Sequence, residues 1–352
     1  MKKMIPLWLL VPLCAFAQTA ADDEQGAQPL FENQDTLQVR IEAPLTTLLR
    51  ERSDTEYLDG TLSYTDASGA EQQLDLELRA RGRYRRARDT CSFPPVRLNF
   101  KKSEVAGTEF AGQDKLKLVT HCRNGSDTYE QYVLKEYLAY KLLNAMTEYS
   151  FGARLFHVTW VDSERDGKTQ LRYGFVIEDD ERVAERIGAE VVKSPMLTYG
   201  QLDAEQANLV AVFEYFIGNT DFSMVHGAKD DDCCHNVVPF SRKDGAYLPV
   251  PYDFDFSGIV NARYAEPNPK LKIASVTRRL YRGLCDFNPS MDATVARFRD
   301  NETALRQTAS SIEGMEAKER DRALKYIDGF YDDISDASSV EKNLIRKCAS
   351  TE

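Results

Sequence analysis

The sequence predicts an α+β fold, in which a β-rich part over residues 36–180 precedes a mainly helical part over residues 181–352. Alternating apolar and polar residues over 73–81 are typical of a strand with one buried face. Apolar residues at helical spacing over 128–146 predict one long helix within the β-rich part. From about residue 288 the chain is charged, with helical apolar spacing, which predicts that it ends in helices.

Residues 1–17 have the organisation of a secretory signal peptide. Two lysines precede a short apolar run, and a small-x-small cleavage site ends at Ala17. We therefore expect an exported protein, periplasmic or extracellular, with a flexible leader over residues 18–35. The alternative is a lipid anchor on Cys14. No later stretch is apolar and long enough to predict a transmembrane segment in the mature protein.

The chain of 352 residues is acidic, with a formal net charge of −11. Such a surface repels other polyanions. The charge therefore argues against nucleic acid or an anionic membrane as the general partner.

Cysteine usage agrees with export, since six cysteines remain after residue 17. An even number in an oxidising compartment indicates disulfides. We expect Cys91 to pair with Cys122, and the other bonds to form among Cys233, Cys234, Cys285 and Cys348. A zinc site at Cys233, Cys234 and His235 is the alternative, but structural zinc ligands are usually separated by two or more residues.

Further elements follow from alternation, apolar runs and turn residues. In the first part, strands are expected at 37–45, 61–65, 73–81, 96–100, 116–119, 154–161 and 170–178, most of them antiparallel. Asp127 with Glu130 predicts a capping box at the start of the long helix. In the second part, a helix is expected over 203–217 with Gly218 as its stop, and short strands at 236–240 and 246–252.

An acidic, amide-containing segment carries most of the chemistry. Asp221, Asn236, Asp253 and Asp255 lie within it, and their oxygens suit a hard divalent cation. Phosphoryl transfer needs such a cation and one carboxylate near the incoming hydroxyl. The alternative is that 253–255 simply ends a strand before a turn.

A basic run at 79–86 stands out against the acidic background. Arg81 and Arg83 flank Gly82, which lets the backbone approach a ligand closely. Guanidinium groups match the oxygens of a polyphosphate, so this run is a candidate phosphate contact. The alternative is a strand edge that charge keeps in solution.

The order of these motifs resembles that of the spore coat protein H (CotH) family of secreted atypical protein kinases, over about residues 74–260. The resemblance rests on LELRARGRYRR, PPVRLNF, LKLVTHCRNGSDTYEQYVLKEYLAYKLL, YGFVIE, the Asn-x-Asp at 219–221, Asn236, and the segment 252–255. Tyr252 stands where the family usually has tryptophan.

The resemblance implies a two-lobed protein-kinase-like fold, with an antiparallel-sheet N-terminal lobe, a mainly helical C-terminal lobe, and ATP in the cleft. Asp253 would bind Mg or Mn with Asn236 and Asp255, and Asp221 would be the catalytic base.

The same resemblance implies the nucleotide contacts. Lys117 or Arg97 would contact phosphate, with Glu136 as the helix partner of the cation. Glu178, at the end of its strand, would belong to the hinge that meets the adenine.

The expected function is therefore transfer of the γ-phosphoryl group of ATP to a hydroxyl on an unidentified protein. The alternative is an inactive kinase-like domain that binds an envelope component. A third reading is a structural protein whose carboxylates bind calcium.

Overall fold

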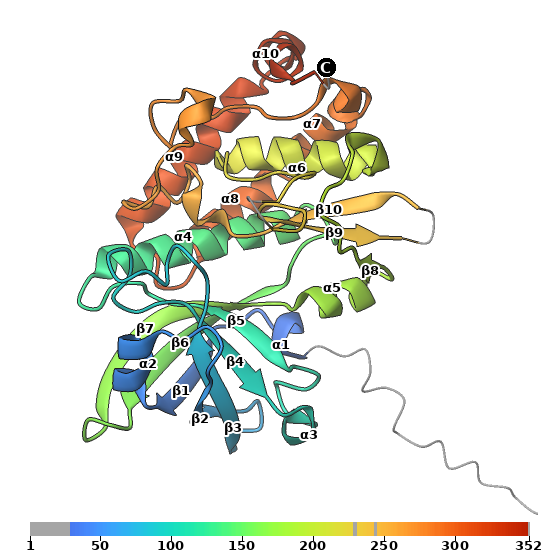
Figure 1. Ribbon diagram of the computed structural model, residues 1–352. Helices are drawn as coiled ribbons and strands as arrows, with labels where there is room; N and C mark the ends of the chain where they lie inside the picture. The colour runs from blue at the N-terminus through green and yellow to red at the C-terminus, as the bar shows by residue number, and fades with distance from the viewer. Residues whose placement is uncertain (1–28, 228–230, 243–244, 351–352) are drawn as a thin grey trace, which may run out of the picture.

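The computed structural model describes residues 29–227, 231–242 and 245–350. The expected signal peptide, and the leader as far as residue 28, lie outside these residues. The described chain forms a β-barrel next to a larger, mainly helical part (Figure 1). The barrel strands are β1 (Leu37–Ala43), β2 (Leu58–Thr65), β3 (Glu71–Ala80), β4 (Val96–Phe100), β5 (Lys115–Val119), β6 (Ala153–Asp162) and β7 (Lys168–Ile177).

The barrel corrects the expected fold class. Its strands close in the order β1-β2-β3-β4-β5-β7-β6, and β1 pairs in parallel with β6. The prediction of a two-lobed protein-kinase-like fold with an antiparallel-sheet N-terminal lobe is therefore wrong. Alternation along a strand reveals which side chains are buried, but not which distant strand it pairs with. The pairing of Leu37–Ala43 with Phe156–Asp162 closes the sheet, and no local pattern encodes that pairing.

The strands themselves were predicted correctly in place. Leu74, Leu76 and Leu78 of β3 are buried, as the alternation required. They belong to an apolar cluster contributed by most barrel strands, together with Phe110 and Trp160. Burying apolar surface stabilises a protein by about 25 cal/mol per Å². This burial is the main stabilising contribution to such an interior.

Helix α4 (Asp127–Asn144) is the predicted long helix, but its capping box does not form. Ser126 is the N-cap residue and its side chain makes no capping hydrogen bond. The carboxylate of Glu130 instead accepts the backbone N–H of Tyr173 in β7, at 2.6 Å. The tertiary contact with the barrel thus replaces the local one.

The helical part begins after the barrel. Helix α6 (Ala204–Ile217) ends at Gly218, whose φ of 70° allows the predicted stop. A three-stranded sheet, ordered β10-β9-β8, lies beside it. Its strands are β8 (Glu190–Val191), β9 (Val237–Ser241) and β10 (Tyr247–Pro251). The remaining α-helices are α1 (Pro29–Glu32), α2 (Leu45–Glu51), α3 (Lys102–Val105), α5 (Asp180–Arg186), α7 (Met291–Asp300), α8 (Glu302–Ser311), α9 (Ala317–Asp333) and α10 (Ala337–Asn343).

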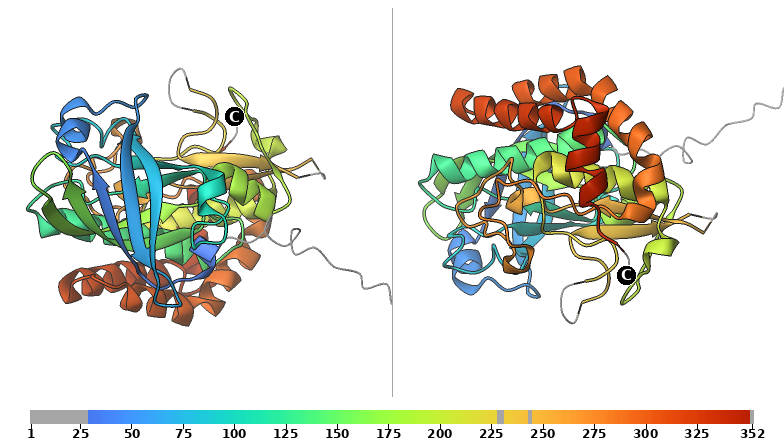
Figure 2. Two further views of the ribbon diagram at one scale, coloured as in Figure 1. Left: turned by 90° about the horizontal axis from the view of Figure 1, so that it is seen from below. Right: turned by 90° about the horizontal axis from the view of Figure 1, so that it is seen from above.

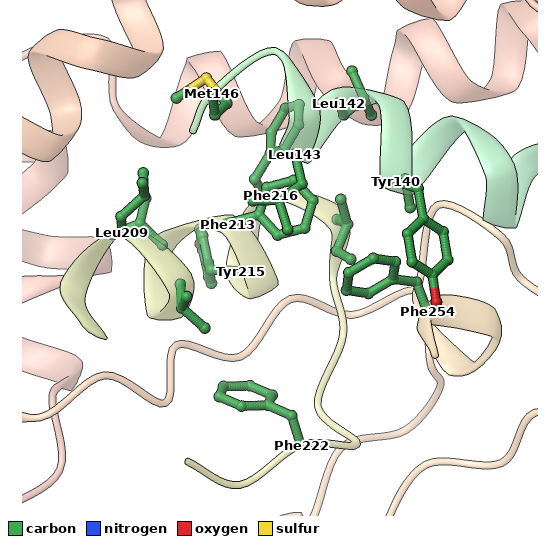
Figure 3. Packing of buried hydrophobic residues seen from close by; sticks show 14 of the residues in the cluster. Tyr140, Leu142, Leu143, Met146, Leu209, Phe213, Tyr215, Phe216, Phe222 and Phe254 are labelled. Carbon is green, nitrogen blue, oxygen red and sulfur yellow. The ribbon is translucent and has the colours of Figure 1, made fainter. Parts of the chain in front are cut away.

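A second apolar core holds α4 and α6 together. Tyr140 of α4 and Phe213 of α6 both contact Phe254, with ring centroids 4.7 and 5.7 Å away (Figure 3). The terminal helices pack against this core. In Figure 2 the barrel strands are nearest the viewer in the view from below, and α10 is nearest in the view from above. Phe254 thereby anchors the acidic segment 253–255 between two buried helices.

The described residues form three disulfides: Cys91–Cys122, Cys233–Cys234 and Cys285–Cys348. The Cys91–Cys122 prediction is confirmed. Because Cys233 and Cys234 are bonded to each other, they offer no thiolate pair for the alternative zinc site. Among the described residues, no helix has both the length and the apolar character needed to cross a membrane.

Candidate functional site

A cavity of about 650 Å³ lies where the loop after β3 meets the segments around β9 and β10. The basic run contributes Arg81, Arg83 and Arg85 to its wall. The opposite wall contains Asp221, Asp231, Asp232, His235, Asn236, Asp253 and Asp255. The cavity therefore brings the predicted basic run and the predicted acidic segment together.

Arg85 is the centre of the site. Its Nη1 and Nη2 donate to Glu136 of α4, at 2.7 and 3.2 Å. Nη2 also donates to Oδ1 of Asp253 at 2.9 Å, and Nε lies 3.2 Å from Oδ2 of Asp255. One guanidinium thus connects three carboxylates, and one ligand oxygen from each of the three lies within 4.8 Å of the others.

Burial differs sharply among the three carboxylates. Glu136 and Asp255 are almost wholly buried, whereas the side chain of Asp253 is 41% exposed. Burial raises the pKa of Glu136 and, more strongly, that of Asp255, although the Arg85 charge opposes both shifts. Asp253 is therefore the member of the cluster with the most exposed side chain on the cavity wall.

The backbone holds Asp253 and Asn236 in unusual conformations. Their φ angles are 62° and 54°, in the left-handed region that residues other than glycine rarely adopt. The N–H of Asp253 donates to the Tyr140 hydroxyl at 2.9 Å, and the N–H of Tyr252 donates to the Asn236 carbonyl at 2.9 Å. Such conformations persist where the surroundings enforce them, and they concentrate at functional sites.

Asp221 lies in a separate hydrogen-bonded group on the cavity wall. Its Oδ1 is 2.8 Å from Nε2 of His235, and its Oδ2 accepts from Nδ2 of Asn236 at 3.2 Å. Asn219 accepts the backbone N–H of Asp221 at 2.9 Å. The hydrogen bond to Asp221 raises the pKa of His235 despite its partial burial. This arrangement can accept or deliver a proton near neutral pH.

The donor set fits a hard divalent cation on the cavity side. Asp253 contacts Arg85 through Oδ1, which leaves its Oδ2 for a ligand, and Asn236 donates to Asp221 through Nδ2, which leaves its only side-chain oxygen, Oδ1, for a ligand. Asp255 is less suited, because it is buried against Arg85 and Tyr264. Asp253 and Asn236 would therefore be the main ligands of a cation, and Asp255 would be a weaker candidate.

Lys117 and Arg97, two of the residues expected to contact the nucleotide, are not among the described residues that line the cavity. Nζ of Lys117 donates to Asp180 at 2.6 Å, so the expected partnership of Lys117 with Glu136 is wrong. Lys117 does lie 5.5 Å from the centroid of the Tyr252 ring, at the margin of the site. Arg97 lies opposite Lys117 in β4, outside the group of described residues that line the cavity. The position of Lys117 in its strand therefore did not reveal that Arg85 is the basic residue that contacts Glu136 of α4.

Glu178 does not line the cavity as described. Its carboxylate is buried and receives hydrogen bonds from Arg186 at 2.9 Å and from the Gly152 N–H at 2.8 Å. These contacts hold the carboxylate within the protein, and the expected hinge role of Glu178 stays a prediction. The basic run divides similarly, because Arg83 forms an ion pair with Asp231 at 2.6 Å. The Arg81 side chain lines the cavity, where its charge interacts with that of Asp253.

The contacts of Arg85 with Glu136 and of His235 with Asp221 were not predicted from the sequence. Arg85 belongs to the basic run that was singled out, but nothing distinguishes it there from four neighbouring arginines. His235 precedes Asn236 directly, and that adjacency was the available signal for its contact with Asp221.

A scan against protein-family models and a search of curated proteins found no match for this chain.

Proposed function

We propose that the chain binds ATP with a divalent cation in the cavity and transfers the γ-phosphoryl group to a hydroxyl on a protein. The observation that carries the proposal is the convergence of Arg81 and Arg85 with Asp221, Asn236 and Asp253 on one cavity. A volume of about 650 Å³ is within the usual range for small-molecule sites. The motif order that resembles the CotH family supports the same chemistry.

The residues divide the work as follows. Arg81, which lines the cavity and interacts with the charge of Asp253, would bind phosphate oxygens. Asp253 and Asn236 would hold Mg or Mn, which supplies charge neutralisation at the β- and γ-phosphates when bound. Asp221 would orient the acceptor hydroxyl and take its proton, and His235 would stabilise the carboxylate.

The outer part of the cavity suits a less polar group. Val191, Val192, Val238 and Pro239 line it beside the Cys233–Cys234 disulfide. Apolar walls with a few polar groups at one end are typical of ligand sites. This wall would receive the base, while the phosphates meet the arginines.

One observation favours the alternative, a protein that binds a partner without turnover. Arg85 already contacts all three clustered carboxylates, so each of them has a cationic partner without a metal ion. In that case Arg85 and its partners would only join the barrel loop to α4 and to segment 253–255.

Purified residues 18–352 would be incubated with γ-labelled ATP and either Mn or Mg, alone and with candidate acceptor proteins. We expect metal-dependent incorporation that Asp253→Asn reduces at least a hundredfold. Asp59→Asn, which neutralises an exposed carboxylate on the barrel, is the matched control and should retain full activity. Absence of both labelling and nucleotide-induced thermal stabilisation in the unaltered chain would overturn the proposal.

A further inference from the structure

A second cavity, of about 470 Å³, lies against α4. Helix α4, helix α9 and the segment after residue 257 form its walls, and these elements adjoin in Figure 1. The lining residues are Thr128, Tyr132, Lys135, Gly258, Ile259, Asn261, Arg263, Thr277, Glu319, Arg322 and Tyr326. None of them takes part in the site proposed above.

Lys135 forms the floor of this cavity. It is 4% exposed, and its Nζ donates to Oε2 of Glu319 at 2.9 Å. The same Nζ lies 5.3 Å from the centroid of the Tyr132 ring. Burial lowers the pKa of Lys135, and the Glu319 carboxylate opposes that shift. An ammonium group held at such depth gains from any further negative charge nearby.

Positive charge exceeds negative charge around the cavity. Lys135, Arg263 and Arg322 are cationic, whereas Glu319 is the single acidic residue of the lining. Glu319 is also shared, because it contacts both Lys135 and Arg322. Arg263 makes no ion pair within the described residues, and it is exposed toward solvent. The lining therefore carries a formal surplus of two positive charges in a chain whose net charge is −11.

Neutral hydrogen-bonding groups complete the walls. Thr128 and Thr277 line opposite sides, and the Tyr326 hydroxyl donates to the Thr277 carbonyl at 3.1 Å. Guanidinium groups pair readily with the oxygens of phosphate, and a buried lysine adds a compact point charge. Like charges around one cavity repel each other, and a bound anion relieves that repulsion.

We propose that this cavity is a binding site for a small phosphate-bearing anion with at least two negative charges. Arg263 and Arg322 bind its outer oxygens, and Lys135 with Glu319 sets the depth to which it enters. The site is separate from the proposed phosphotransfer site, because the two cavities share no lining residue: Lys135 lines one, and Arg85, the partner of Glu136, lines the other.

Pyrophosphate is the probe, titrated calorimetrically into metal-free residues 18–352 at low ionic strength. The titration uses the unaltered chain and Arg81→Gln, so that binding in the first cavity is counted separately. We expect Arg263→Gln/Arg322→Gln to weaken one class of sites at least tenfold and Arg81→Gln to leave that class unchanged. The charge-matched control is Arg297→Gln/Lys342→Gln, which alters exposed residues outside the cavity.

Both arginines of the test variant are exposed, so folding should be retained, and its unfolding transition would be checked. If the control pair weakened pyrophosphate binding equally, the affinity would depend only on the net charge of the protein, and the proposal would be overturned. Unaltered affinity in Arg263→Gln/Arg322→Gln, or no saturable binding in the Arg81→Gln background, would overturn it as well. None of these outcomes depends on whether ATP is turned over in the first cavity.

Discussion

Arg85 and Glu136 form a doubly hydrogen-bonded ion pair, with nitrogen–oxygen distances of 2.7 and 3.2 Å, that joins the loop after β3 to α4. Both side chains are buried, at 8% and 1% exposure. A pair of this kind stabilises less than its Coulomb energy suggests, because both charges lose their hydration. Its removal from one side is costly, since the remaining charge stays buried without a partner.

Replacement of Arg85 by glutamine should destabilise the fold by about 3–5 kcal/mol, because Glu136 and Asp255 then lose their buried counter-charge. Urea unfolding at neutral pH measures the change. The destabilisation should be smaller at acidic pH, since protonated carboxyl groups carry no charge for the guanidinium to balance. Arg86→Gln, next in the chain but more exposed, is the control and should cost less than about 1 kcal/mol. Similar losses in both variants would contradict the central position of Arg85.

Glu214 in α6 predicts a distinct pH dependence of stability. The side chain is wholly buried, and burial raises its pKa to about 8, although the nearby Asn219 and the charge of Arg282 oppose the shift. The folded protein therefore retains this proton at pH values where the unfolded chain, with a pKa near 4.5, has lost it. By linkage, this contribution is complete below pH 4.5 and is lost as the pH rises to about 8.

Glu214→Gln should remove that dependence. Between pH 4.5 and 8, the free energy of unfolding of the variant should rise relative to that of the unaltered chain, by at most about 1.4 kcal/mol per pH unit. Denaturant unfolding across this range is the measurement. Glu205→Gln, an exposed position on the same helix, should leave the slope unchanged. A constant difference between Glu214→Gln and the unaltered chain would contradict the raised pKa.

Local sequence patterns predicted the elements of this fold but not their closure. The leucines of β3 revealed a buried face because side chains alternate along any strand. Closure depends on β1 meeting β6 in parallel, and this pairing lies between segments with no shared local signal. The capping box was not predicted correctly for a related reason, because the Glu130 carboxylate accepts the backbone N–H of Tyr173 in a distant strand instead.

The candidate site shows the same limit. Asp221, Asn236 and Asp253 could be selected because their residue types suit the chemistry, and the structure places them on one cavity. The partner of Glu136 could not be selected, since Arg85 arrives from an irregular loop whose path no periodicity describes. Lys117 has the expected strand position, but its ammonium group donates to Asp180.

Asp221→Asn should lower the pKa of His235 toward its ordinary value, because the hydrogen bond to the carboxylate is the largest cause of the rise. NMR titration of the four histidines would measure the shift. Since the folded pKa lies above the unfolded one, this pair contributes stability below pH 6.5 and loses it as the pH rises through the folded pKa. Asp232→Asn, on the same cavity, is the control. An unmoved His235 resonance in Asp221→Asn would refute the contact.

The disulfides should differ in stabilisation according to the loops they close. Cys285–Cys348 encloses a sequence separation of 63, and Leu284 and Ala349 pair as an isolated β-bridge beside it. Loss of such a cross-link frees the unfolded chain and should cost about 4 kcal/mol in Cys285→Ser/Cys348→Ser. Cys233 and Cys234 are adjacent, so their bond closes no loop of that kind.

Cys233→Ser/Cys234→Ser is therefore the matched comparison, with the same atoms exchanged but almost no change in chain entropy. Its midpoint of thermal unfolding should stay close to that of the unaltered chain, whereas Cys285→Ser/Cys348→Ser should unfold at a clearly lower temperature. Equal losses in the two variants would mean that contacts of the sulfurs, and not loop closure, determine the stabilisation. That result would assign the Cys233–Cys234 bond a packing role in the cavity wall that it forms.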